Sequence, residues 1–334
     1  MQNEKGFGAL LQHFTGSKNH NIALREFALK KGLSLSEYGI KKNGKLLEYK
    51  TEEEFYRAVG LLWIPQELRE DTGEIEASLK NELPDLVRLE DIKGDQQIHS
   101  DFPIEPSHDL GSSPMEDIVK KGESLGYEYV GFSEHNPSIG NHTEQQMISI
   151  LKKRKEKIEK LQLSTKMRII SLLEVDILSD GNLAISNQAM ELLDGVIASV
   201  HTVFNQPRDK MTERIIKALE NPYVRFLGHP TGRLLNEREG YEADWDKIFK
   251  VCKKYDKALE INAYPNRLDL PDTLVRSAIK AGVKLIINTD SHDVSQMDLI
   301  KYGVYVARRG WATKDDIINT LGYNDLIRWV HKRN

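Results

Sequence analysis

The residues of this sequence that could do chemistry are histidines and carboxylates that directly follow apolar segments. The stretches "YVGFSEH" and "LIINTDSH" each end in an acid and a histidine. Histidine and carboxylate side chains without cysteine suit Zn, Mn or Fe at a hydrolytic site. Positions of this kind are His99, Glu134, His135, Glu174, Asp176, His201, His229, Glu260, Asp290 and His292.

The recurrence of these positions carries more weight than any one of them. A single histidine is more often a packed core or surface residue than a ligand, but seven segment ends of this kind are hard to explain by packing alone. Unpaired buried charges are costly, and coordination of a metal removes that cost. Clustered metals stabilise both the attacking and the leaving oxygen in phosphoester hydrolysis. The pattern therefore predicts a multi-metal centre that is, or once was, catalytic.

The elements that must position these residues are short strands that alternate with helices. From Gly94 onward, apolar runs such as "MRIISLLEVDIL" and "LDGVIASVH" alternate with amphipathic stretches such as "MTERIIKALEN". Repeated strand-then-helix patterns predict an α/β fold with a parallel barrel. The carboxyl ends of barrel strands share one face, so the histidines and carboxylates should meet there.

The N-terminal part has a different pattern. Residues 7–31 are expected to be helical with a turn at residues 14–17, where Ser17 caps the second helix. Asn43-Gly44 predicts a hairpin, and Thr51 with Glu54 predicts a capping box before another helix. We expect a small α+β domain over residues 1–70, a connector over 71–93 and the α/β domain over 94–334.

Composition excludes several classes of protein. The 334 residues are 39% hydrophobic and 29% charged, and no run approaches the ~20 apolar residues of a membrane span. The single cysteine, Cys252, excludes internal disulfides and suits a reducing cytoplasm, so we expect a cytoplasmic protein without membrane contact. The net charge is −4, yet residues 1–50 hold nine Lys or Arg against four Glu, a basic region that can contact phosphates.

Residues 94–334 resemble a PHP (polymerase and histidinol phosphatase) domain, and most closely that of family X DNA polymerases. The motifs that carry the resemblance are "GDQQIHS", "FSEHNPS", "LLEVDILSDG", "ASVHTVFNQ", "FLGHPTGRLL", "LEINAYPNRLDL", "INTDSH" and "YGVYVARRGW". The resemblance implies a distorted seven-stranded (β/α) barrel with a trinuclear metal centre. It also implies Mn-stimulated 3′→5′ exonuclease or 3′-end phosphoesterase activity on DNA 3′ ends or gapped DNA, in a protein that is commonly monomeric.

The resemblance also implies a ligand set of two to three divalent metals, Zn or Mn, with Fe possible. The first metal would be held by His99, Glu174, Asp290 and a histidine two residues before His99. This sequence has Gln97 there, which should weaken the first site because a neutral amide oxygen substitutes poorly for imidazole. The second would use Glu174, His201 and His229. The third would use His135, His292 and either His108 or Asp109 from the loop "DFPIEPSHDLGS".

Several further residues receive expected roles. Glu174 would bridge two metals, and Asp290 or a nearby acid would orient the attacking water. Arg233 and Arg267 are candidate phosphate clamps, since arginine matches phosphate bidentately. Glu134 is expected to orient a histidine ring. The other histidines, His13, His20, His142 and His331, are expected at the surface, with DNA contact as an alternative for His20.

Residues 10–40 resemble the end of the palm and the thumb of the same polymerases. By that resemblance Thr15, Gly16, Ser17, Asn21 and Arg25 would line the DNA. A polymerase palm needs three aspartates, and this chain has no Asp before Asp71, so it should not polymerise DNA alone. Two alternatives stay open: a weakened PHP subunit that binds DNA or completes a separately encoded polymerase half, and a small-molecule phosphatase of the histidinol-phosphate type.

Overall fold

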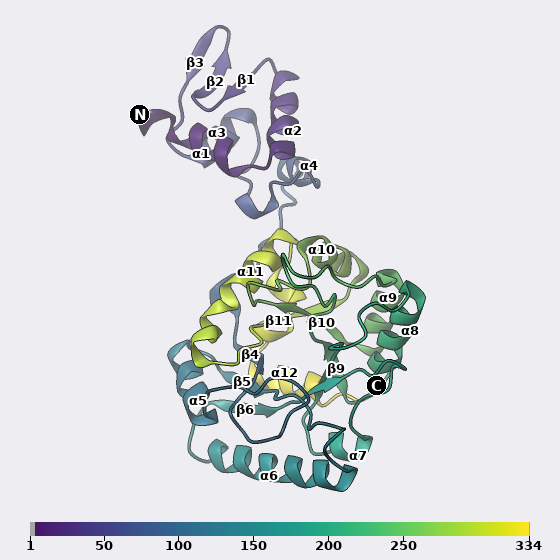
Figure 1. Ribbon diagram of the computed structural model, residues 1–334. Coiled ribbons are helices and arrows are strands. Elements are labelled where there is room, and N and C mark those ends of the chain that lie inside the picture. Colours follow the sequence, from purple (N-terminus) through teal and green to yellow (C-terminus); the bar gives the residue numbers. More distant parts are fainter. Residues whose placement is uncertain (1–3, 334) are drawn as a thin grey trace. The chain divides into compact units, whose positions relative to one another are not determined.

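The computed structural model describes residues 4–333, which divide into two compact units (Figure 1). Unit 1 covers residues 4–85 and unit 2 covers residues 86–333. The division falls inside the segment 71–93, for which the sequence predicts a connector. None of the helices in residues 4–333 is both long and apolar enough to cross a membrane.

Unit 1 packs four helices against a three-stranded antiparallel sheet of order β1-β2-β3. Its elements are α1 (Phe7–Thr15), α2 (Lys18–Leu29), β1 (Ser34–Ser36), β2 (Gly39–Lys42), β3 (Lys45–Leu47), α3 (Glu52–Val59) and α4 (Glu74–Lys80).

The boundaries of these elements follow from local chemistry, much as the sequence predicts. The hydroxyl of Ser17 accepts a hydrogen bond from the backbone of His20 at the start of α2. Asn43 and Gly44 both have positive φ, as the tight turn between β2 and β3 requires. The Thr51 hydroxyl caps α3 by accepting a hydrogen bond from the backbone of Glu54. The Glu54 carboxylate accepts from the backbone of Lys50 rather than from that of Thr51, so only one of the two hydrogen bonds of the predicted capping box forms.

Part of the predicted connector is built into unit 1. Helix α4 buries Ile75, and the Ser78 hydroxyl donates to the carbonyl of Leu62. Glu74 of this segment is fully buried, as is Arg69 just before it. They reach polar partners on α2 and α3, so their charges are compensated inside the unit.

Unit 2 is an α/β unit with two parallel sheets, of order β4-β5-β6 and β11-β10-β9-β8-β7. Its strands are β4 (Gly94–Ile98), β5 (Tyr129–Phe132), β6 (Arg168–Ser171), β7 (Glu174–Asp176), β8 (Val196–Ser199), β9 (Val224–Leu227), β10 (Ala258–Asn262) and β11 (Lys284–Asn288). Its helices are α5 (Met115–Ser124), α6 (Glu144–Gln162), α7 (Asn187–Met190), α8 (Arg208–Leu219), α9 (Trp245–Tyr255), α10 (Asp272–Ala281), α11 (Ile300–Arg309) and α12 (Tyr323–Val330).

Two parallel bridges join the two sheets. A parallel bridge joins Ile98, at the end of β4, to Ser291 beyond β11, and a second joins His135 beyond β5 to Glu174 in β7. In Figure 1 the longer helices surround these strands. The finer expectation of a distorted seven-stranded barrel remains a prediction, since the sheets hold eight short strands.

The interior of unit 2 is apolar at one end of the strands and polar at the other. Helix α12 packs Leu326 and Trp329 against strand residues such as Ile197, Phe226 and Ile286, which closes the amino-terminal end. Cys252 lies in the core between strands and helices. The buried histidines and carboxylates lie at the opposite, carboxyl ends of the strands.

Candidate metal centre

Histidines and carboxylates from many strand ends lie together at the carboxyl ends of the strands. Glu174 opens β7 and is fully buried. Its Oε1 lies 3.0 Å from Nε2 of His229 and 3.4 Å from Nε2 of His201. Its Oε2 lies 3.2 Å from Nδ1 of His135 and 3.4 Å from Nε2 of His99. One carboxylate is thus surrounded by four imidazole rings.

This surrounding explains the ionisation of Glu174. Burial alone would raise the pKa of its carboxyl, but His135 and His201 outweigh burial and hold it well below its usual range. Burial lowers the pKa of His201, yet Glu174 and Asp176 together raise it to about 9. By contrast, burial dominates at His135 and lowers its pKa well below the usual value. The low pKa of Glu174 keeps its carboxylate ionised, which favours cations beside it.

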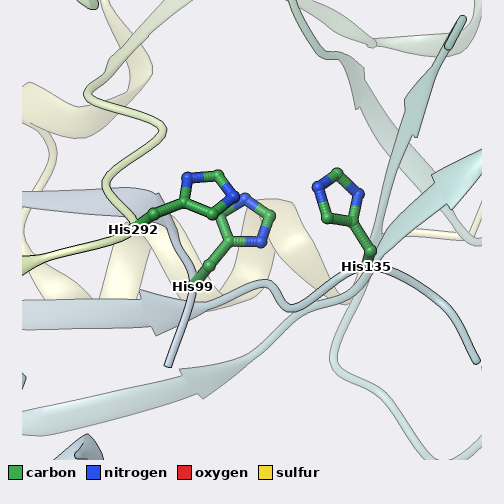
Figure 2. Close-up of side chains that lie close together, drawn as sticks. All are labelled: His99, His135 and His292. Atoms are coloured by element: carbon green, nitrogen blue, oxygen red, sulfur yellow. The ribbon is translucent and has the colours of Figure 1, made fainter. Parts of the chain in front are cut away.

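A second part of the cluster forms around His99, which follows β4. Its Nε2 lies 3.0 Å from Oδ1 of Asp290. Figure 2 shows the ring of His292 lying over that of His99, with His135 facing both. The ring centroids of His99 and His292 are 4.1 Å apart and the rings are nearly parallel. The centroid of His135 lies 4.6 Å from that of His99.

The loop after β4 adds a third part. Nε2 of His108 lies 3.0 Å from Oδ1 of Asp176, and Nδ1 of His201 lies 2.6 Å from the same oxygen. Asp109 is exposed and lines a neighbouring cleft. The sequence left open whether His108 or Asp109 is the loop ligand. In the structure, His108 is the one that lies in the histidine cluster.

The donor set fits metal ions. Within residues 4–333, four groups of three side chains place their ligand atoms within 4.8 Å of one another. They are His99, His135 and His292; His99, Glu174 and Asp290; His135, Glu174 and His201; and His108, Asp176 and His201. Buried ligand atoms of His99, His135, Glu174, Asp290 and His292 have no hydrogen-bond partner among the described residues. Native structures rarely leave so many buried polar atoms unpaired, and divalent cations would satisfy them.

Gln97 lies inside the unit, at the level of the cluster. It is fully buried, and neither its amide oxygen nor its amide nitrogen has a partner among the described residues. Its Oε1 is 3.5 Å from the position that a Cβ on Gly228 would take, one residue before His229. The side chain therefore reaches from β4 toward the opposite strand β9.

The residues around the cluster hold its ligands in place. Asp176 contacts both His108 and His201, while Asp180 closes a turn through Asn182. The expected role of Glu134 is wrong: its carboxylate accepts from Arg154 Nε at 2.5 Å, and from Ser100, rather than from a histidine ring. The buried Arg154 outcompetes neutral imidazole because its charge needs a carboxylate.

Glu260 is buried beneath the cluster but belongs to none of the three-ligand groups. It accepts from the backbone of His229 at 2.7 Å and from Asn288 Nδ2 at 2.9 Å. His229 has a positive φ of 28°, which a non-glycine residue adopts only under constraint, so Glu260 stabilises a strained ligand backbone. Burial raises the pKa of Glu260 well above its usual value.

Sequence reasoning missed two residues near the cluster. Asn262 Nδ2 donates to Oδ2 of Asp290 at 3.1 Å. Asp95 accepts from the Thr289 backbone, and burial raises its pKa to about 7. Asp95 lies two residues before Gln97 on β4, and side chains two residues apart on a strand point to the same face. This spacing is the sequence signal from which the inward position of Asp95 could have been predicted.

The two arginines proposed as clamps occupy different positions. Arg267 lines the cleft beside the cluster, and its Nε lies 3.7 Å from Oδ2 of Asp290. Arg233 donates from Nε to the carbonyl of Arg267 at 2.8 Å and from Nη2 to the carbonyl of Leu268. Arg233 therefore supports the loop that carries Arg267.

In unit 1, most side chains expected to face DNA have internal partners. Thr15 bonds Leu11 and Arg69, and Asn21 bonds Gln12 and the carbonyl of His13. Gly16 ends α1, the Ser17 hydroxyl caps α2, and Arg25 reaches His13 Nδ1 at 3.3 Å from an exposed position.

The expected surface position of His20 is wrong. His20 is fully buried, with Nδ1 2.5 Å from Glu74 Oε1 and Nε2 2.9 Å from the hydroxyl of Tyr56. These partners come from α3 and α4, which a local sequence pattern around His20 does not reveal.

Comparisons with known proteins agree with this arrangement. The family described as "DNA polymerase beta thumb" matches residues 10–70, and the family described as "PHP domain" matches residues 95–264. The chain is 36% identical over 336 residues to the DNA polymerase/3′-5′ exonuclease PolX of Bacillus subtilis, which covers 99% of this chain and 57% of that relative. It is 27% identical over 218 residues to a probable phosphatase of Thermoanaerobacter sp., covering 62% of this chain and 84% of that protein.

Proposed function

This chain belongs to the PHP domain family, with a thumb domain before the PHP domain, and from that premise we propose that it is a metal-dependent 3′→5′ exonuclease acting on DNA. The observation that carries the proposal is the cluster of buried, unpartnered ligand atoms around Glu174. In the reaction, water adds to the terminal phosphodiester and the bond between phosphorus and the 3′ oxygen breaks. The products are a nucleoside 5′-monophosphate and a strand with a new 3′-hydroxyl.

We assign about two to three divalent ions, Zn or Mn, to the cluster. Bound ions would neutralise charge on the reacting phosphate and activate water. The residues that would hold two of them are His99, Glu174 and Asp290, and His201 and His229 with Glu174. The family resemblance assigns the third to His135, His292 and His108, whereas the structure groups His135 and His292 with His99, and His108 with Asp176 and His201.

The chain's own residues do the positioning. Glu174 holds four histidines around one carboxylate, so its loss should disperse the whole cluster. Asp290, held by Asn262, presents a carboxylate oxygen that can accept a hydrogen bond from the attacking water. Arg267 lines the cleft and can bind the phosphate, while Arg233 fixes its loop. In this proposal Arg267 contacts the substrate, and Arg233 acts only by holding the loop of Arg267.

Gln97 makes the first site the weakest of the three. The site keeps one imidazole and two carboxylates, and Gln97 adds at most an amide oxygen. Oxygen ligands suit Mn²⁺ better than they suit Zn²⁺, which prefers nitrogen and sulfur. We therefore expect this site to lose its ion first on dialysis.

Unit 1 would supply the contact to the DNA duplex. Arg25 and the exposed lysines Lys18, Lys41, Lys42 and Lys45 of this unit could contact phosphates. Phosphate contacts of this kind make binding weaken as salt rises.

The test is digestion of a 3′-recessed primer-template by the full chain with MnCl2, beside Glu174→Ala. We expect the wild type to release nucleoside 5′-monophosphates one at a time and the variant to release none. His331→Ala, at an exposed site, is the matched control and should digest like the wild type. Equal digestion by Glu174→Ala would refute the assignment.

One observation favours a second function. The chain covers 84% of the length of a probable phosphatase, so its PHP domain could instead hydrolyse small phosphate monoesters. Release of inorganic phosphate from histidinol phosphate, without digestion of DNA, would favour that function. Absence of both activities would favour a binding subunit for a separately encoded polymerase half.

A further inference from the structure

A cleft of about 520 Å³ opens beside the metal centre. It shares Asp290 and His292 with the centre and is otherwise lined by Asp109, Leu110, Tyr264, Arg267 and Gln296. The cleft is therefore the space next to the cluster in which the part of a substrate beyond its reacting phosphate would lie.

One wall of the cleft carries the positive charge. Among the described residues, the guanidinium of Arg267 has a single ion pair, the 3.7 Å contact with Asp290, which is long for a close pair. Most of its donors are thus available to a phosphate, which arginine binds through two parallel hydrogen bonds.

The same wall carries an aromatic ring without a partner. Tyr264 is half-buried, and within residues 4–333 its ring stacks on no other ring or cation and its hydroxyl makes no hydrogen bond. Leu110 adds an apolar side chain that is 45% exposed. A small phosphate monoester would leave these apolar surfaces in water, whereas a nucleobase would cover them.

Tyr264 and Arg267 belong to one rigid turn. The carbonyl of Tyr264 accepts from the backbone of Arg267 at 2.8 Å and of Leu268 at 2.9 Å. The backbone of Tyr264 donates to Asn262, and Arg233 anchors the far side of the turn through the carbonyl of Arg267. The backbone positions from which the ring and the guanidinium extend are therefore fixed relative to each other, so that one nucleotide with its phosphate can reach both.

We propose that this cleft binds the terminal nucleotide that the reaction releases, with its base on the ring of Tyr264 and its phosphate on Arg267. Tyr264 is then a specificity-determining residue that makes the site select nucleotides over small phosphate monoesters. The inference rests on the proposed function and names the substrate group that the site recognises.

The experiment compares two oligonucleotides under MnCl2, one with a natural 3′-terminal nucleotide and one with a 3′-terminal abasic residue. For the wild type we expect the KM of the abasic end to be about tenfold higher, because base stacking on an aromatic ring is lost. Tyr264→Ala should reduce that ratio to about one by raising the KM of the natural end, and Tyr264→Phe should restore it. Tyr305→Ala, at a 51% exposed site on α11, is the matched control.

Metal content by elemental analysis separates a local effect from collapse of the centre, and should be equal in wild type and Tyr264→Ala. If the wild type digests DNA and Tyr264→Ala keeps the wild-type ratio, the cleft inference fails while the proposed function stands. If the wild type digests neither oligonucleotide but releases phosphate from glycerol 3-phosphate, both fail.

Discussion

Each unit of this protein buries histidine against glutamate, but the two settings differ in the number of histidines and in how many of their polar atoms have partners. In unit 1, both ring nitrogens of His20 have partners, and the Glu74 oxygens also accept from the backbone of Asp71 and Thr72. In unit 2, Glu174 faces four histidines, and several ligand atoms of that cluster have no hydrogen-bond partner among the described residues.

The difference teaches how to tell a structural cluster from a metal site. Both settings bury histidine against glutamate, so that pairing alone does not identify a ligand set. The number of unsatisfied lone pairs does, because buried polar groups are normally paired and a closed network leaves nothing for a cation. We therefore expect the cluster of unit 2 to depend on metal and that of unit 1 to be indifferent to it.

The largest expected effect is that of chelation. An ion present at 1,000 times its Kd adds about 4 kcal/mol to the stability of the state that binds it. Treatment with EDTA should lower the hydrogen-exchange protection of strands β7 and β8 strongly and leave that of helix α2 unchanged. Equal loss of protection in both units, or no loss in either, would contradict the claim that only the cluster of unit 2 depends on metal.

The complementary change targets the closed cluster. His20→Ala leaves the Glu74 carboxylate buried without its side-chain partner, which should cost about 3 kcal/mol in unit 1. Urea unfolding followed by hydrogen exchange in α2 measures this cost. Bound metal should not change, and His13→Ala, at a half-buried position of the same unit, should cost far less.

A smaller effect is expected at Gln97. Replacing its unpartnered amide by imidazole should raise the affinity of the first site for metal. Loss of one hydrogen-bond partner of a metal ligand changes metal affinity about tenfold or more, and we expect a gain of at least that size from a new ligand. Titration of Gln97→His with Mn²⁺ and with Zn²⁺ measures the change. An unchanged affinity and stoichiometry would show that residue 97 does not contribute to the site.

The smallest effect is a pH dependence in unit 1. Burial raises the pKa of Glu74, but hydrogen bonds from His20 and the backbone outweigh it and hold the pKa below the usual value. The folded-state pKa is thus below the unfolded one. The stabilisation by Glu74 is therefore present above the unfolded value of about 4.3 and is lost as pH falls through the folded value. Glu74→Gln should flatten this acid slope in unit 1, and a slope unchanged by the substitution would contradict the assignment.

Much of the cluster could be predicted from the sequence because strand ends converge. His135, His201 and His229 each lie just beyond a short apolar strand, and His99 lies just beyond β4. Parallel strands bring such residues to one edge. The caps at Ser17 and Thr51 and the turn at Asn43-Gly44 were also predictable, since each depends on residues within a few positions.

What could not be predicted depends on long-range partners. Glu134 looks like a ligand-orienting acid until Arg154, twenty residues later, is found against it. His20 looks exposed until Glu74 and Tyr56 are placed around it by α3 and α4. Arg233 and Arg267 look equivalent in sequence, and only the loop geometry separates the residue that faces the cleft from the one that supports it.

The most direct test of the central claim is a metal count by elemental analysis on the purified full chain, for wild type, Glu174→Ala and His20→Ala. We predict about two to three bound ions in the wild type and in His20→Ala, and one or none in Glu174→Ala, because Glu174 contacts four of the histidines. A wild type without bound metal, or a Glu174→Ala variant with the full number, would contradict the claim that the open cluster of unit 2 is a metal centre.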